Sequence, residues 1–153
     1  SEMCIRDSNA GEIADVIAIE VDDVNKKVKV ELFHLKFSQE DRPGARINDL
    51  YAVNGQAQKC VSWLHTRPEH IIGRMLRRGA SGPKNRYELG TEEQLSIIRE
   101  KVKSLYEIEY IVHIVQPGLS KAAASREQLK LLSLTEAFLW ETRMIELGVI
   151  ASA

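Results

Sequence analysis

The sequence predicts an α/β fold: a mixed β-sheet, with an antiparallel hairpin followed by parallel strands, flanked by α-helices. Three observations support this prediction. Two runs rich in β-branched residues, 14–21 and 28–36, alternate apolar and polar positions around a polar turn, as antiparallel strands with one buried face do. Two later stretches open with helix-capping sequences, at Thr91 and Ser125. A nearly continuous apolar run, residues 108–115, is typical of a central strand.

The turn between the first two strands sets the register of the hairpin. If Asp22 faces Lys27, every facing pair sums to the same number, so Glu20 stands opposite Lys29 and the two can form an ion pair. The same register gathers six apolar side chains on one face. They are Ile17, Ile19, Val21, Val28, Val30 and Leu32. We therefore expect this face to be buried.

Three polar residues stand at the open end of that apolar face. Asp15 faces His34 in the same register, and Lys36 lies two residues farther along the second strand. A carboxylate, an imidazole and an ammonium group would be costly to bury without partners. We therefore interpret Asp15, His34 and Lys36 as a chemical site rather than as part of the core.

This arrangement resembles the catalytic core of the PD-(D/E)XK nuclease superfamily, which has the restriction-endonuclease-like fold. That core has an Asp at the start of one strand, an antiparallel neighbour ending in (D/E)-x-K, and then a helix. The resemblance implies a metal-dependent nuclease in which Asp15 and His34 hold a divalent ion, Mg²⁺ or Mn²⁺. It implies that Lys36 assists the water that attacks a DNA phosphodiester, in a bacterial or phage-defence setting.

The residue at position 34 departs from the family pattern. His34 stands where the family has Asp or Glu, and the nearest acid on the strand, Glu31, points to the opposite face. Imidazole suits zinc, copper, iron and nickel better than magnesium, which prefers oxygen ligands. Two alternatives therefore stay open: an active metal-dependent nuclease, and a catalytically degenerate relative that serves as a nucleic-acid or protein interaction module.

A loop over residues 38–46 follows the hairpin, and a helix is predicted from Asn48 or Asp49 to about His65. Its apolar stripe is Leu50, Val53, Ala57, Val61 and Leu64. The nuclease family often has a glutamine on this helix. Gln56 and Gln58 both fit, so periodicity does not choose between them. Gln56 enters the candidate site, with two glutamines on a solvated helix edge as the alternative.

The chain then becomes basic, with six Arg and Lys residues against a single acid between positions 65 and 86. A short helix is predicted from Glu69 to Arg78, ending at Gly79, and a cationic loop follows it. Phosphate contacts are typical of such loops. The candidate nucleic-acid-binding residues are Arg74, Arg77, Arg78, Lys84 and Arg86. Stabilisation of the helix end by arginines and plain solvated charge are the alternatives.

The remaining elements complete the α/β pattern. The Thr91 capping box opens a helix that carries Leu95, Ile98, Val102 and Leu105, and strand 108–115 is expected to stop at Gln116-Pro-Gly118. The Ser125 capping box opens a helix that runs to about Ile145, and strand 147–151 returns to the sheet. A strand, a helix and a strand in this order predict a parallel crossover. His113 lies within its strand and is expected in the core.

Composition limits the remaining possibilities. With 153 residues, 44% of them hydrophobic, and a net charge of −1, the chain can bury one core and carries no general basic coat. It has no apolar run of membrane-spanning length. Two cysteines far apart, Cys4 and Cys60, favour a reducing cytoplasm. No zinc spacing, dinucleotide fingerprint or phosphate loop is present.

The first ten residues are expected to lie outside the fold. Residues 1–8 show neither the helical nor the strand period and resemble a translated sequencing adapter, and residues 8–10 resemble a tag-cleavage scar. Residues 1–10 are therefore expected to be non-native or disordered, and 11–153 to form a single nuclease-like domain. We expect that domain to be truncated at its N-terminus and to be the C-terminal part of a larger protein. Its expected partners are DNA and the other domains of that protein, and a homodimer stays open.

Overall fold

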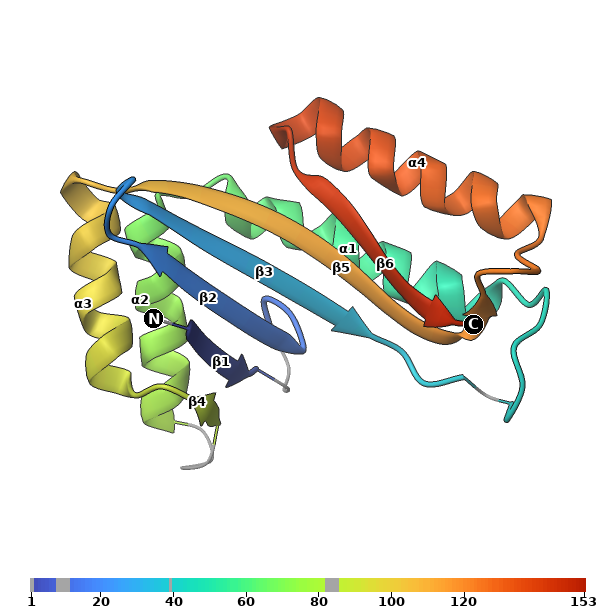
Figure 1. Cartoon of the computed structure of the whole chain (residues 1–153), viewed down its shortest axis with the longest axis horizontal. Helices are drawn as coiled ribbons and strands as arrows, with labels where there is room; N and C mark the ends of the chain where they lie inside the picture. Colours follow the sequence, from blue (N-terminus) through green and yellow to red (C-terminus); the bar gives the residue numbers. More distant parts are fainter. Residues whose placement is uncertain (1, 8–11, 39, 82–85) are drawn as a thin grey trace. The chain divides into compact units, whose positions relative to one another are not determined.

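The protein has an α/β fold. A computed structural model describes residues 2–7, 12–38, 40–81 and 86–153, and in these residues six strands form one mixed sheet flanked by four helices (Figure 1). The strand order is β4-β1-β2-β3-β5-β6. The strands are β1 (Glu2–Arg6), β2 (Val16–Asp22), β3 (Lys27–Leu35), β4 (Tyr87–Leu89), β5 (Glu107–Ser120) and β6 (Glu146–Ser152). The helices are α1 (Asn48–Leu64), α2 (Pro68–Ser81), α3 (Glu92–Ser104) and α4 (Arg126–Arg143). The predicted fold class is confirmed.

Residue contacts divide the chain into two compact units, each built from two separate segments. The first unit comprises residues 1–32 and 62–110, and the second comprises residues 33–61 and 111–153. Strands β3 and β5 contribute residues to both units. The contacts thus form two clusters, and the single domain predicted for residues 11–153 stays a prediction.

The predicted hairpin is present as β2 and β3. Its turn is closed by the Asp22 carboxylate, which accepts a hydrogen bond from the Asn25 backbone N–H at 2.9 Å, and this bond lowers the pKa of Asp22. The Lys29 ammonium lies 2.8 Å from the Glu20 carboxylate, the ion pair that the register predicted. All six apolar side chains of the predicted inner face are buried.

The strand that follows the hairpin in the sheet runs parallel to β3. The Glu107 N–H donates to the Lys26 carbonyl at 3.0 Å, and the Lys36 N–H donates to the Val115 carbonyl at 3.2 Å. Because residue numbers rise together in the two pairs, β3 and β5 have the same direction. β6 is parallel to β5, from Ile111 opposite Glu146 onward. The predicted order of antiparallel hairpin and parallel strands is therefore confirmed.

Strand β5 is longer than predicted, because Gln116-Pro-Gly118 does not end it. The strand continues to Ser120, and its register with β6 shifts between Gln116 and Ser120. A proline removes one ladder donor but is tolerated at such an irregularity. Helix α2 also exceeds its prediction, because it begins at Pro68 and continues past Gly79 to Ser81. Proline is favoured at the first helical position.

The N-terminal segment forms strand β1, contrary to the expectation that it lies outside the fold. β1 pairs antiparallel with β2, with Ile5 opposite Ile17, and antiparallel with β4. Met3 and Ile5 are buried while Arg6 is exposed. Five residues are too few to show a period in the sequence, so only pairing with distant strands reveals this one. No helix in the described ranges is long and apolar enough to cross a membrane.

Candidate functional site

The three residues of the predicted cluster lie in or directly beside the strands of the β2–β3 hairpin. Asp15 directly precedes β2, is half-buried, and accepts a hydrogen bond from the Asp7 N–H on its backbone carbonyl at 2.9 Å. His34 is the last but one residue of β3 and is only 3% exposed. Lys36 directly follows β3 and is exposed. By contacts, Asp15 belongs to the first unit, and His34 and Lys36 belong to the second.

The expected metal ligands offer one carboxylate and one imidazole. Among the residues that the structure describes, no group of three or more His, Cys, Asp or Glu side chains is placed to hold a metal ion. A two-residue set would leave the other positions to water and phosphate oxygens, as magnesium sites commonly do. The imidazole of His34 favours a transition metal. The donor set therefore fits Mn²⁺ better than Mg²⁺.

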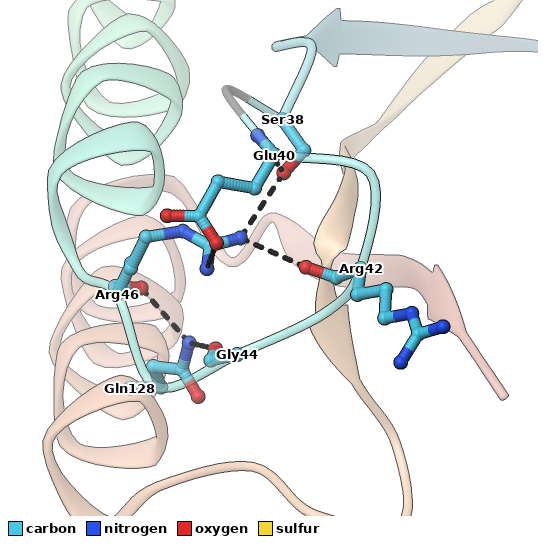
Figure 2. Close-up of polar contacts among 6 residues, drawn as sticks. All are labelled: Ser38, Glu40, Arg42, Gly44, Arg46 and Gln128. Carbon is cyan, nitrogen blue, oxygen red and sulfur yellow. Dashed lines mark hydrogen bonds and ion pairs between the residues drawn. The ribbon is translucent and has the colours of Figure 1, made fainter.

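The loop that follows Lys36 is held together by the Arg46 guanidinium, as Figure 2 shows. One terminal nitrogen lies 2.5 Å from the Glu40 carboxylate. The other donates to the Arg42 carbonyl at 2.9 Å and to the Ser38 hydroxyl at 3.4 Å. These contacts span nearly the whole loop, so a single side chain fixes its course.

Gln128 fastens the same loop to the start of α4 (Figure 2). Its amide nitrogen donates to the Gly44 and Arg46 carbonyls at 2.7 and 2.9 Å, while its amide oxygen accepts the Ser125 N–H of the capping box. The side chain is almost fully buried. A residue that the sequence assigned only to helix capping thus also orders the segment after Lys36.

Strand β5 supports this loop from a second direction. The Gly44 N–H donates to the Gly118 carbonyl at 3.1 Å. The buried Gln116 accepts the Gly118 N–H at 2.7 Å. A Cβ atom added at Gly118 would lie 2.9 Å from the Ser38 hydroxyl oxygen. A Cβ atom at this position would therefore force the Ser38 and Gln116 side chains to shift.

The two candidate glutamines of α1 have different surroundings. Gln58 donates to the Thr135 hydroxyl at 3.0 Å, and that hydroxyl in turn donates to the buried Asn54 side chain at 2.5 Å. Gln58 therefore belongs to a polar ladder that joins α1 to α4. Gln56 is half-buried, and its amide oxygen has no hydrogen-bond partner within the described residues. Gln56 is thus the better site candidate of the two.

Two of the five candidate phosphate-binding residues are occupied by an internal ion pair. Arg86 is 5% exposed and donates to the Asp7 carboxylate at 3.2 Å and to the Met75 carbonyl at 3.0 Å. Arg78 donates to the same carboxylate at 2.5 Å. Breaking a buried pair leaves an uncompensated charge at a cost of about 3–5 kcal/mol. We therefore assign Arg78 and Arg86 to the packing of the first unit.

The other basic candidates differ in setting. The Arg74 guanidinium lies over the Trp63 ring, 3.8 Å from its centroid. Arg77 is exposed, and Lys84 lies outside the described residues. His70, Arg74 and Arg77 follow the helical spacing of one face of α2, and the exposed Arg67 immediately precedes that helix. Arg67 is one of the six basic residues counted in this segment but was not among the binding candidates, and His70 was not considered, because charge along the chain does not show which residues share a helix face.

Comparisons with protein-family models, with curated proteins and with solved structures find no match for this chain.

Proposed function

We propose that the chain is a metal-dependent nuclease domain, with a restriction-endonuclease-like arrangement, that hydrolyses phosphodiester bonds in nucleic acid, most simply DNA. The β2–β3 hairpin is the observation that supports this proposal most strongly. Asp15 directly precedes β2, Lys36 directly follows β3, and a short turn joins the two strands. A hairpin places the first residue of one strand and the last of the next at the same end. The parallel strand β5 beside β3 also agrees with the nuclease resemblance.

Each residue of the proposed site has a chemical role. Asp15 and His34 would hold a divalent ion, which supplies charge neutralisation at the phosphate and an acidified water when bound. The exposed Lys36 ammonium would orient that water and stabilise the charge that develops on the phosphate. The water oxygen would bond to phosphorus as the bond from phosphorus to the leaving sugar oxygen breaks, with the proton of the water passing to solvent and the sugar oxygen gaining a proton from solvent. Gln56 would position the phosphate through its side-chain amide.

Plasmid cleavage tests this proposal. The chain should convert supercoiled plasmid to nicked or linear DNA in Mn²⁺ and not in EDTA. Lys36→Ala should abolish cleavage and leave folding intact, because an exposed residue beyond the end of a strand contributes little to the core. Lys121→Ala, an equally exposed lysine beyond the end of β5, is the matched control and should cleave normally. A folded Lys36→Ala protein that cleaves at the normal rate would remove Lys36 from the mechanism.

A second candidate function is favoured by the face of α2. If the chain is catalytically inactive because His34 replaces an acid, it still has His70, Arg74 and Arg77 on one face of α2 and Arg67 directly before that helix. The three arginines of this row can contact successive phosphates without reading base sequence. The alternative is therefore a degenerate nuclease fold that binds nucleic acid.

Two free cysteines, Cys4 and Cys60, fit a cytoplasmic setting for either function.

A further inference from the structure

A pocket with an acidic rim lies between α4 and β6. Its volume is about 580 Å³. Its apolar lining comes from Ala137, Trp140, Ile145 and Leu147, and Ser133 adds a hydroxyl. Glu136, Glu141 and Glu146 contribute three carboxylates. None of the lining residues is basic, and all three acids are exposed. Three like charges around one pocket repel one another, so the site favours a cationic occupant.

The strand beside this pocket is an edge strand. β6 ends the strand order, so among the described strands only β5 pairs with it. Its seven residues include a single charge, Glu146, and no proline. Natural edge strands usually carry lysine, proline or a bulge that prevents pairing with another chain. β6 has none of these along its outer edge, and its Ile150 side chain is 48% exposed.

Helix α4 adds apolar surface next to the pocket. It buries the polar side chains of Gln128 and Thr135, while Trp140 is 54% exposed. Met144, which directly follows the helix, is 72% exposed. Apolar side chains grouped at the surface and bordered by charge are typical of interaction sites. Pocket, edge strand and exposed side chains all belong to the second unit.

We propose that this surface binds a basic, extended segment of another protein. The segment adds to β6 as a further strand through backbone hydrogen bonds, and one of its lysine or arginine side chains enters the pocket. The aliphatic stem of that side chain packs on Trp140, and its charged end meets Glu136 and Glu141. Backbone pairing supplies affinity, and the carboxylates supply the preference for a basic sequence. This inference is independent of the proposed nuclease activity.

Peptide binding tests the proposal. The probe is a fluorescent eight-residue peptide that alternates lysine and valine, and its charge-reversed partner alternates glutamate and valine. The lysine peptide should bind and the glutamate peptide should not. Glu136→Gln with Glu141→Gln should weaken lysine-peptide binding about tenfold, the upper range for two exposed ion pairs. Glu92→Gln with Glu100→Gln on α3, both exposed, changes the net charge equally and should leave the affinity unchanged.

Hydrogen exchange separates strand addition from simple adhesion. Bound lysine peptide should slow the exchange of β6 amides that point away from β5. Protection confined to α4, equal binding of both peptides, or undiminished binding by the Glu136 and Glu141 double variant would each overturn the proposal. Dimers of the free chain with protected β6 amides would also overturn it, because a second copy would then be the natural occupant.

Discussion

Gly148 illustrates how one residue determines the packing of another across the sheet. It stands opposite His113 in the parallel pairing of β5 with β6. A Cβ atom added at Gly148 would lie 2.2 Å from His113 Nδ1. The His113 ring also stacks on Phe33, with ring centroids 4.4 Å apart, so moving the ring would disrupt a second contact. A side chain at position 148 is therefore incompatible with the present position of His113.

The same substitution at two glycines should have opposite effects on stability. Gly148→Ala should lower the free energy of unfolding by about 1–3 kcal/mol, the usual cost of overpacking. Gly55 lies inside α1, and a Cβ atom there would meet nothing within 4 Å. Gly55→Ala should therefore raise the free energy by about 0.5–1 kcal/mol, because alanine is the better helix former. Urea unfolding at pH 7 measures both, and a loss at Gly55 or a gain at Gly148 would contradict this account.

Some residues could not be assigned from the sequence because their partners are distant. Arg86 has a local charge pattern like that of a phosphate ligand, yet its carboxylate partner Asp7 is 79 residues away. Gln58 likewise meets Thr135 across 77 residues. Local patterns identified the helix caps at Thr91 and Ser125, which the structure shows with complete capping boxes. Periodicity predicts which side chains face inward but not which distant group they meet.

Among the elements, helix α2 has a buried apolar face and an outer face that carries basic side chains. Its inner side buries Ile71, Ile72 and Met75. On its outer side the side chains of His70 and Arg77 are exposed to solvent, and Arg74 stacks on the Trp63 ring. An arginine on an aromatic ring keeps a defined position. The Arg74 guanidinium on this face is therefore already held in position in the absence of a bound phosphate.

The salt dependence of binding tests the function of that face. Arg67→Ser with Arg77→Ser should weaken duplex DNA binding in EDTA and flatten the plot of log affinity against log salt by up to about 1.8, from about 0.9 per lost phosphate contact. Arg126→Ser with Arg143→Ser on α4, both exposed, is the charge-matched control and should keep the parent slope. Equal slopes in both double variants would remove the α2 face from nucleic-acid binding. Because EDTA prevents metal-dependent cleavage, this result does not depend on the nuclease proposal.

Elements were predictable from the sequence where their signals are local. The hairpin, α1, α3, α4 and β6 each have a period or a cap within a few neighbouring residues, and the structure contains all of them. β1 and β4 have no such signal, because five and three residues are too few to show a period. They are strands because β1 pairs with β2 and with β4. The predicted end of β5 was wrong, because a Pro-Gly pair usually ends a strand but does not end this one.

At the scale of the whole molecule, the chain visits each compact unit twice. Strands β3 and β5 pass from one unit to the other at residues 32–33 and 110–111. Of the residues named in the proposed function, Asp15 belongs to the first unit, and His34, Lys36 and Gln56 belong to the second. The sequence predicted the sheet that joins these strands, but its division into two contact clusters depends on tertiary packing. No pattern along the chain marks those boundaries.

If Asp15 and His34 hold a divalent metal ion, calorimetric titration with Mn²⁺ should detect its binding. One Mn²⁺ should bind per chain, and its affinity should fall at least about tenfold in both Asp15→Ala and His34→Ala, since each substitution removes a ligand. His70→Ala, which removes an exposed histidine on α2, should bind as the parent does. A parent chain that binds no Mn²⁺, or variants at Asp15 and His34 that bind it as tightly as the parent, would contradict the claim.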